Sequence, residues 1–332
     1  MKLSDSPITR HCFHGHPFHL KRDDLLHSQF SGNKARKFLA LLNGDFSEVH
    51  TLVGYGSAQA NSLYSLAVLS ACRGWKLKFY VDHIPSFIKD RPMGNYRGAI
   101  EMGAEVIDLS QLEDRGERHP SQYIEDTYAN EPGYLIIPEG GRSPLAEEGV
   151  KQLADEIVNW KMMERMEELT VALPSGTGTT ALYLQKHLHQ FGIEVLTCAC
   201  VGGEEYLTEQ FNELDSESPK PTILGTEHKH HFGRLEQENY KTWQELEEQT
   251  HVEFELLYDP LMWRCLKDWL PANTGRNLLY IHQGGTMGNE TMLPRYQRMF
   301  DGGSVATEKQ RSKRVCGGSN SSGKLRSVKA DW

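Results

Sequence analysis

Short apolar runs alternate with longer amphipathic stretches along most of the chain. The runs are rich in Val, Ile, Leu and Tyr, and Gly, Ser and Asn stand where one kind of segment meets the other. Continuous apolar runs of this length are typical of strands buried on both faces, and amphipathic stretches are typical of covering helices. The pattern therefore predicts an α/β fold with helix-covered, mostly parallel sheets. The predicted strands are 49–53, 77–81, 106–109, 134–137, 169–173, 195–199, 254–258 and 278–282, and the predicted helices are 33–42, 58–73, 95–102, 145–160, 179–189, 243–249, 261–269 and 290–300.

Turn-forming residues indicate where some of these elements end. Asn43-Gly44 and Gly74 each follow a periodic segment, and a glycine there predicts a helix closed by a left-handed cap. The polar segment 110–132 predicts a loop that separates two sheet-forming regions. The segment 301–332 contains seven basic against three acidic residues and a Gly/Ser-rich run, so we predict a disordered basic tail there.

Composition narrows the class of protein. The 332 residues are 38% hydrophobic and 24% charged, which is typical of a soluble globular chain with one large or two medium domains. A net charge of -9 provides no general basic field for nucleic acid, and no window is apolar for long enough to span a bilayer. The first residues lack the apolar core of a signal peptide, so we expect a cytoplasmic protein that binds neither nucleic acid nor membrane. The scattered cysteines include no CxxC pair, which favours reduced thiols and no metal site.

The start of the first predicted helix carries three cations, Lys34, Arg36 and Lys37. The helix dipole disfavours positive charge at this end, so the cations require another explanation. Neighbouring cations and the dipole lower the pKa of an amine, which makes the amine a good nucleophile toward an aldehyde. Lys34 is therefore a candidate nucleophile, although a surface lysine on an amphipathic helix is the simpler interpretation of this segment taken alone.

A predicted strand runs directly into Ser175-Gly176-Thr177-Gly178-Thr179-Thr180, and a predicted helix follows. Glycines free backbone N–H groups to surround an anion, hydroxyls add donors, and the helix N-terminus contributes its positive end. The loop is therefore a candidate phosphate-binding cup. It lacks the ending of a Walker loop, but Gly176-x-Gly178-x-x-Ala181 loosely matches a dinucleotide fingerprint, with Glu204 about one strand downstream. A tight turn that requires small residues accounts for this loop alone equally well.

Two further loops place polar side chains after predicted strands. Ser57, Gln59 and Asn61 open a long helix, where amide and hydroxyl donors can hold a carboxylate or a ring hydroxyl. Gln283 follows the last predicted strand, at the carboxyl edge where ligands bind in α/β sheets. A nucleophilic lysine, a phosphate cup and a carboxylate loop are together what pyridoxal phosphate requires when it acts on an amino acid.

The order and spacing of these four motifs resemble a known family. The runs Ser-Gly-Asn-Lys-Ala-Arg-Lys, Gly-Ser-Ala-Gln-Ala-Asn, Ser-Gly-Thr-Gly-Thr-Thr and His-Gln-Gly-Gly are similar to those of the 1-aminocyclopropane-1-carboxylate deaminase / D-cysteine desulfhydrase family, which are pyridoxal-phosphate enzymes. The resemblance covers residues 10–300 and implies the tryptophan synthase β-subunit-like fold (fold type II), with two open parallel α/β sheets and the active site between domains. It also implies a large domain from residues 1–42 and 151–300 and a small domain from residues 43–150.

The resemblance assigns roles to individual residues. Lys34 would bond to the aldehyde of pyridoxal 5'-phosphate and would move protons at the substrate Cα. Asn61 would contact the 3-oxygen of the ring, and Ser57, Gln59 and Asn61 would hold the substrate carboxylate. The residues that would bind the cofactor, besides Lys34 and Asn61, are Ser175, Gly176, Thr177, Gly178, Thr179, Thr180 and Gln283.

The chain departs from the family pattern on the substrate side. Ala60 stands where a serine is common, and Met262 and Trp263 stand where the family has a tyrosine followed by an acidic or hydroxyl residue. Tyr258 can supply a hydroxyl from a shifted position, so we include it among the candidate substrate-binding residues. If Gln283 faces the pyridine nitrogen, it offers a hydrogen bond without formal charge, and the weak electron sink that results suits elimination or deamination.

We therefore predict a pyridoxal-phosphate-dependent lyase or deaminase that removes the Cα proton of a small amino acid and releases ammonia and a 2-oxo acid, as D-cysteine desulfhydrase or 1-aminocyclopropane-1-carboxylate deaminase does. Many relatives of this fold are dimers, so we expect a homodimer. Two alternatives stay open. One is a nicotinamide-dependent oxidoreductase built on Gly176-x-Gly178-x-x-Ala181, in which Glu204 or Glu205 holds a ribose. The other is a protein of the same fold that binds cofactor or amino acid but has lost turnover.

Overall fold

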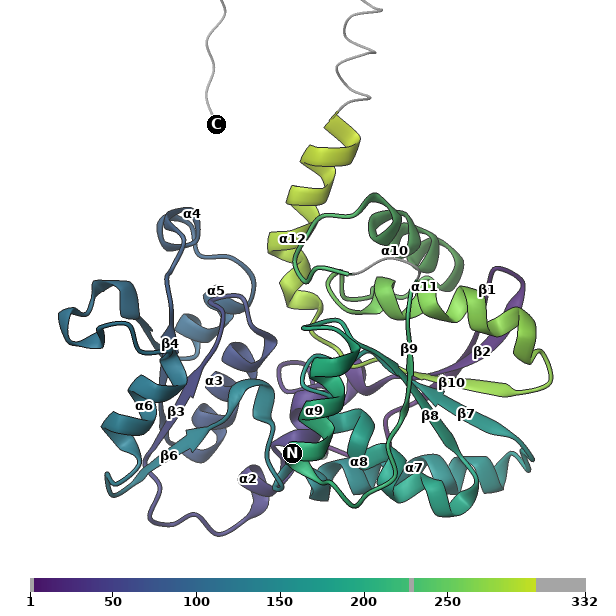
Figure 1. Cartoon of the computed structure of the whole chain (residues 1–332), viewed down its shortest axis with the longest axis horizontal. Coiled ribbons are helices and arrows are strands. Elements are labelled where there is room, and N and C mark those ends of the chain that lie inside the picture. The colour runs from purple at the N-terminus through teal and green to yellow at the C-terminus, as the bar shows by residue number, and fades with distance from the viewer. Residues whose placement is uncertain (1–2, 227–229, 303–332) are drawn as a thin grey trace, which may run out of the picture. The chain divides into compact units, whose positions relative to one another are not determined.

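The computed structural model describes residues 3–226 and 230–302 (Figure 1). Residues Met1–Leu293 form one compact unit that contains two sheets, and Pro294–Trp332 form a second unit. In the second unit the structure describes the end of helix α12 (Asn289–Tyr296) and a π-helical turn at Gln297–Asp301. The tail predicted at 301–332 lies outside the described residues from 303 onward.

The smaller sheet has four parallel strands in the order β5-β4-β3-β6. Leu52 and Phe79 belong to the core cluster beneath helices α3 and α5, and their chain neighbours Val53 and Tyr80 belong to the cluster beneath α6. Because adjacent strand residues point to opposite faces, these strands are apolar throughout and need helices on both sides. The elements are β3 (Thr51–Tyr55), α3 (Asn61–Arg73), β4 (Lys76–Val81), α4 (Ser86–Asp90), α5 (Gly94–Glu101), β5 (Glu105–Asp108), α6 (Pro120–Tyr128) and β6 (Tyr134–Ile137).

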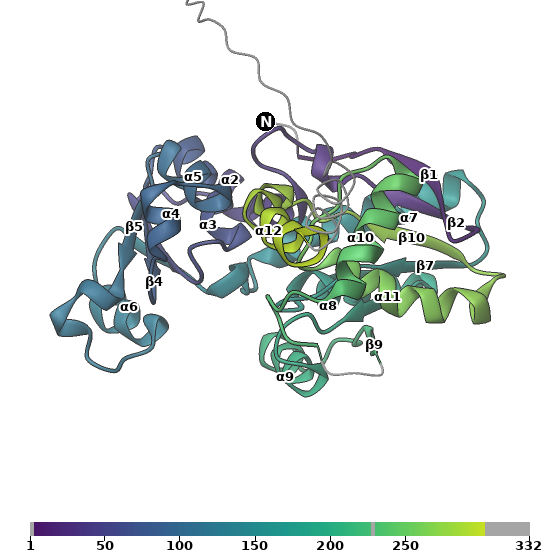
Figure 2. The ribbon, with the colours of Figure 1, turned by 90° about the horizontal axis from the view of Figure 1, so that it is seen from above.

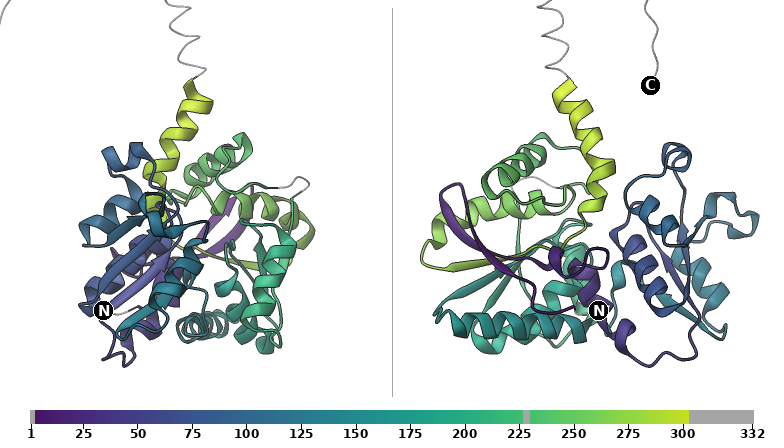
Figure 3. Two further views of the ribbon diagram at one scale, coloured as in Figure 1. Left: turned by 60° about the vertical axis from the view of Figure 1, so that its left-hand side comes forward. Right: turned by 180° about the vertical axis from the view of Figure 1, so that it is seen from behind.

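The larger sheet has six strands in the order β1-β2-β10-β7-β8-β9. Its first two strands form an antiparallel hairpin along one edge (Figure 3, right), and the other neighbours pair in parallel. Helices α7 and α8 cover one face, and α10 and α11 cover the other (Figures 1 and 2). The elements are β1 (Ile8–Phe13), β2 (His16–Lys21), α7 (Ala146–Met163), β7 (Leu169–Ala172), α8 (Thr179–Leu188), β8 (Glu194–Cys198), α9 (Glu204–Leu214), β9 (Thr222–Leu224), α10 (Gln237–Thr250), α11 (Asp259–Trp269) and β10 (Asn277–Ile281).

The α/β class with mostly parallel sheets is confirmed, and one predicted strand is wrong. Residues 254 and 255 are irregular and residues 256–258 form a turn, because the carboxylate of Glu255 accepts hydrogen bonds from the backbone N–H groups of Leu257 and Tyr258 and closes the chain on itself. The hairpin β1–β2 was not predicted, since histidines and cations interrupt its apolar positions. The three-residue strand β9 is too short to give an alternating pattern.

Three of the predicted helices and one predicted loop differ from the structure. The helix predicted at 243–249 is only the second half of α10, which begins at Gln237. The helix predicted at 33–42 is broken at Phe38 into α1 (Gly32–Lys37) and α2 (Leu39–Asn43), and Gly44 has φ -72°, so the left-handed cap predicted there is wrong. The helix predicted at 58–73 begins later, at Asn61, but Gly74 has φ 71° and closes it as predicted. The segment 110–132 is not entirely a loop, since it contains α6, whose buried residues include Tyr123 and Ile124.

Candidate functional site

A cavity of about 370 Å³ lies where the loops that follow β3, β7 and β10 meet helix α1. Ligand sites in parallel α/β sheets occur at this carboxyl edge, and the volume is in the usual range for a small-molecule site. All of the residues predicted from the sequence to bind cofactor or substrate line it. They are Lys34, Ser57, Gln59, Asn61, Ser175, Gly176, Thr177, Gly178, Thr179, Thr180, Tyr258 and Gln283.

The predicted phosphate cup is the turn between β7 and α8. Gly178 has φ 72°, and a Cβ atom there would lie 2.4 Å from Cε1 of Phe211, so the turn requires glycine on both conformational and steric grounds. The hydroxyl of Thr180 is buried and has no hydrogen-bond partner among the described residues. Ser175 contributes backbone only, because its hydroxyl is hydrogen-bonded to that of Thr197 at 2.7 Å. The cup thus leaves a donor at the start of α8 that a bound anion can use.

The three cations of α1 have three different environments. Arg36 is fully buried and forms ion pairs with Asp23 and Glu156, away from the cavity. Lys34 lines the cavity, and its nearest hydrogen-bond acceptor is the Asn33 side-chain oxygen at 3.4 Å. Burial lowers the pKa of Lys34 to about 8, which leaves part of the amine neutral near pH 7. Lys34 therefore has the environment that a nucleophilic amine requires, and its role as the nucleophile stays a prediction.

Lys37 lies beside the cup, which the sequence did not predict. Its amine donates hydrogen bonds to the backbone oxygen of Gly140 at 3.1 Å and to the hydroxyl of Thr177 at 3.4 Å. Burial and the charge of Lys34 lower the pKa of Lys37, so a bound anion would relieve an unfavourable environment for its charge. The spacing of three residues on one helix was the available signal, because positions three apart share a face.

The loop after β3 carries the predicted carboxylate-binding residues. Ser57 is exposed, and its hydroxyl accepts a hydrogen bond from the backbone N–H of Gln59 at 3.2 Å. The Gln59 side-chain oxygen accepts from Thr291 at 3.1 Å, while its amide nitrogen is buried without a partner among the described residues. The Asn61 side-chain oxygen accepts from Asn95 at 2.8 Å, which fixes the orientation of the amide. This loop therefore offers free amide donors to the cavity.

The side chain of Gln283 links the start of α1 to the loop that follows β7. Its side-chain oxygen accepts from the Asn33 side chain at 2.8 Å, and its side-chain nitrogen donates to the backbone oxygen of Pro174 at 2.7 Å. A Cβ atom on Gly32, which has φ 65°, would lie 1.8 Å from the backbone oxygen of Gln283. Gln283 thus holds the start of α1 against the cup, and both ends of its amide are engaged by protein.

The residues that depart from the family pattern fall into two groups: some are buried in the core, and the others line the cavity. Met262 and Trp263 are fully buried, and Trp263 stacks on Tyr280 with ring centroids 4.8 Å apart, so both belong to the core and do not line the cavity. Ala60 lines it, as does the adjacent Ser62. Tyr258 also lines it, and its ring lies 3.4 Å from where a Cβ on Gly176 would be.

Glu255 is a second cavity residue that the sequence did not identify. Its side chain is 2% exposed, and burial together with the charge of Asp259 raises its pKa to about 8. The residue lies in the segment predicted to be a strand, where the sequence gives no sign that the chain turns toward the loops after β3 and β10.

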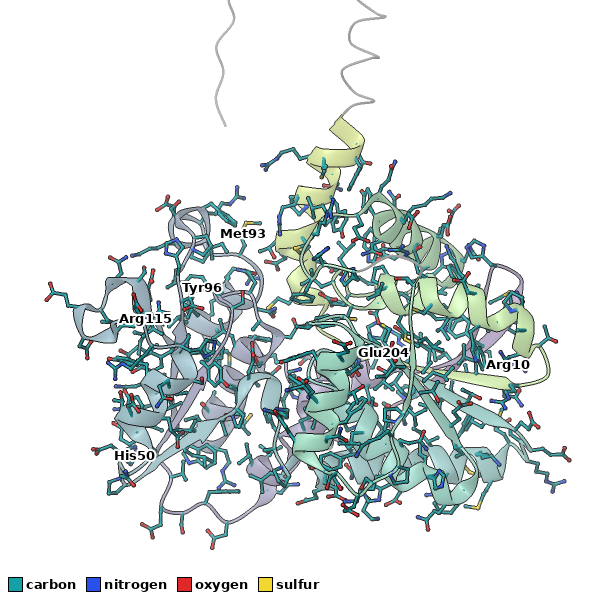
Figure 4. All side chains as sticks on the ribbon, viewed as in Figure 1. Arg10, His50, Met93, Tyr96, Arg115 and Glu204 are labelled. Carbon is teal, nitrogen blue, oxygen red and sulfur yellow. The ribbon has the colours of Figure 1, made fainter. Side chains whose placement is uncertain are left out.

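The nicotinamide-dependent alternative assigned ribose binding to Glu204 or Glu205, and both residues lie outside the cavity. Both are exposed in the first turn of α9, where Figure 4 labels Glu204, and neither lines the cavity. Within the described ranges no group of three or more His, Cys, Asp and Glu side chains is placed to hold a metal. No helix in the part of the chain that the structure describes is long and apolar enough to cross a bilayer.

Several solved structures have the same fold as this chain. The chain superposes on an ACC deaminase homologue with a TM-score of 0.72 and 18% identity, over 90% of this chain and 95% of that one. A hydrogen sulfide-producing enzyme from Fusobacterium nucleatum gives a TM-score of 0.62 at 14% identity, over 86% and 97%. A threonine deaminase gives 0.59 at 16% identity, over 84% and 92%. No protein-family model and no curated protein sequence matches the chain. The chain has the tryptophan synthase β-subunit-like α/β fold that its sequence resemblance implies.

Proposed function

We propose that the protein is a pyridoxal-phosphate-dependent lyase or deaminase that acts on a small amino acid. The observation that carries the proposal is the meeting, in one cavity, of a lysine amine of lowered pKa, a glycine-rich cup at a helix start and a loop of amide donors. These groups come from residues 34, 175–180 and 57–61, which only the fold brings together. Neighbours of the same fold include an ACC deaminase homologue, a hydrogen sulfide-producing enzyme and a threonine deaminase, which supports the reaction class.

The residues fit the chemical groups of pyridoxal phosphate. The cup and Lys37 would hold the phosphate, since the Thr180 hydroxyl has no partner in the described chain and Lys37 is buried beside Thr177. Lys34 would bond to the aldehyde, and Asn61 would contact the ring oxygen with the free end of its amide. Pyridoxal phosphate supplies an electron-withdrawing ring that stabilises negative charge at the substrate Cα.

Side chains of this protein would move the proton and would hold the substrate. After the amino acid displaces it, Lys34 would take the Cα proton, for which an amine with a pKa near the working pH is well suited. Gln59, whose amide nitrogen has no partner in the described chain, would hold the substrate carboxylate with neighbouring N–H groups of its loop. Loss of a group from the β-carbon, followed by addition of water, would release ammonia and a 2-oxo acid.

The visible absorption spectrum of the purified protein with added pyridoxal phosphate tests the proposal. We expect a yellow band that borohydride bleaches, and a stable mass increase on the peptide that contains Lys34. Because only the neutral amine attacks an aldehyde, the rate of covalent capture should rise as pH rises through about 8 and should level off above it. A protein that is colourless once the unbound cofactor, which is itself yellow, has been removed by gel filtration would contradict the proposal and would favour the nucleotide-binding alternative.

Replacing Lys37 with methionine should weaken binding of pyridoxal phosphate by roughly ten- to a hundredfold, the effect of one charge-assisted contact of about 1.5–3 kcal/mol. Binding of pyridoxal, which lacks the phosphate, should change little. Titration of both ligands by absorbance measures the difference. Lys241→Met, at an exposed lysine on α10, is the matched control. An equal loss for both ligands would mean that Lys37 acts on the shape of the site and not on the phosphate.

A further inference from the structure

Glu255 has one carboxylate oxygen in use and one without a partner. Oε2 accepts hydrogen bonds from the backbone N–H groups of Leu257 at 2.7 Å and Tyr258 at 2.8 Å. Oε1 is buried and has no hydrogen-bond partner among the described residues. Closing the turn at 255–258 requires only one of the two oxygens. A buried acceptor without a partner is costly, so the second oxygen calls for another explanation.

The free oxygen lies on the Asn61 side of the cavity. A Cβ atom built on Gly288 would be 3.5 Å from Oε1 of Glu255 and 3.8 Å from the side-chain oxygen of Asn61. Both side chains therefore lie close to Gly288, and both of these residues line the cavity. Asn61 is the residue that would contact the ring oxygen of pyridoxal phosphate, and on that ring a single carbon separates the carbon bearing this oxygen from the nitrogen. With Asn61 on the ring oxygen, a group beside Asn61 would be within reach of the edge that carries the nitrogen.

The other candidates for contact with the ring nitrogen are occupied. The amide of Gln283 is engaged at both ends, by Asn33 and by Pro174. Trp263, at the position where the family has an acidic or hydroxyl residue, is packed in the core against Tyr280. Asp259 accepts hydrogen bonds from Tyr280 and from the backbone N–H of Glu255, one on each oxygen. Among Gln283, Asp259 and Glu255, only Glu255 has a side-chain oxygen without a hydrogen-bond partner among the described residues.

We propose that Glu255 binds the ring nitrogen of pyridoxal phosphate through Oε1. The proposal rests on the proposed function. A buried carboxylate needs a cation or a proton beside it, and a protonated pyridine ring supplies one. Burial and Asp259 raise the pKa of Glu255 to about 8, so the carboxyl can bring the shared proton into the site near neutral pH. On this proposal the ring would be a stronger electron sink than the expectation based on Gln283 implies.

The test is the ¹⁵N resonance of holoenzyme reconstituted with pyridoxal phosphate labelled at the ring nitrogen. We expect the wild-type resonance at the upfield position of a protonated pyridine. Glu255→Gln keeps an oxygen for the two backbone N–H groups but removes the charge, and it should move the resonance downfield toward the free base. Glu253→Gln is the matched control, since Glu253 lies two residues away on the same loop, is exposed and does not line the cavity.

The outcomes separate this proposal from the proposed function. A wild-type protein that takes up no cofactor contradicts the proposed function, and this proposal with it. A holoenzyme whose wild-type resonance is that of the free base overturns the role of Glu255 alone, even if Glu255→Gln does not fold. A protonated resonance that stays in place in Glu255→Gln and moves in Gln283→Leu also overturns it and returns the role to Gln283.

Discussion

Replacing Lys34 with alanine is expected to lower kcat/KM by roughly three orders of magnitude, because the variant loses both its nucleophile and the base that takes the Cα proton. The cup, Lys37 and Asn61 stay in place, so the variant should still bind pyridoxal phosphate without a covalent bond. Borohydride should then leave no cofactor on the protein. Steady-state kinetics on an amino acid that the wild type consumes, together with peptide mapping after reduction, measures both effects.

A small amine provides the control for this experiment. Methylamine can enter the space that the Lys34 side chain vacates and accept the proton in its place, so it should restore part of the activity of Lys34→Ala. Lys241→Ala should behave as wild type, since Lys241 is an exposed residue of α10. A Lys34→Ala variant that borohydride still labels would place the covalent bond on another amine, and Lys37, buried in the same cavity, is the residue to map first.

Replacing Arg36 with alanine is expected to reduce the free energy of unfolding by about 3–5 kcal/mol, the cost of breaking a buried ion pair from one side. The guanidinium bonds Asp23 at 2.9 and 3.0 Å and Glu156 at 2.7 and 2.9 Å, and it is fully buried. Its loss would leave the Asp23 carboxylate buried with, among the described residues, only the hydroxyl of Ser6 as a side-chain donor. Urea denaturation of the apoprotein measures the change.

A double-mutant cycle identifies the cause of that loss. Asp23→Asn removes the charge that Arg36→Ala leaves unpaired, so the two changes together should cost less than the sum of their separate effects. Arg36→Lys should recover only part of the stability, because a lysine cannot form two bidentate contacts at once. Strict additivity of Arg36→Ala and Asp23→Asn would mean that packing of the arginine stem, and not the ion pair, supplies the stability.

The sequence predicted those parts of the site that local chemistry determines. The glycine and threonine residues of 175–180 follow an apolar strand and precede a helix, so the local pattern made them a candidate anion cup, with a tight turn as the equally good alternative. Ser57, Gln59 and Asn61 have the same relation to β3. Each of these loops can be recognised from the strand before it and the helix after it. In the structure both loops line one cavity.

The parts that the sequence could not predict depend on contacts between distant segments. Lys34, Arg36 and Lys37 look alike in the sequence, and their environments differ because Glu156, Thr177 and Gly140 come from elsewhere in the chain. Glu255 was assigned to a strand because its neighbours are apolar, whereas its own side chain closes a turn. Met262 and Trp263 were assigned to the substrate side by resemblance, and their contacts place them in the core.

The strand order of the larger sheet has a consequence for how the protein is made. β10 (Asn277–Ile281) pairs with both β2 and β7, so it is an inner strand although it is the last to be synthesised. The smaller sheet is complete once residue 137 has left the ribosome, and it can fold early as a unit. The larger sheet has a gap at its centre until residue 281 emerges, and Gln283, which holds α1 against the cup, follows directly. Between the synthesis of residue 180 and that of residue 281, a nascent chain therefore carries the lysine and the cup without a site in which they meet.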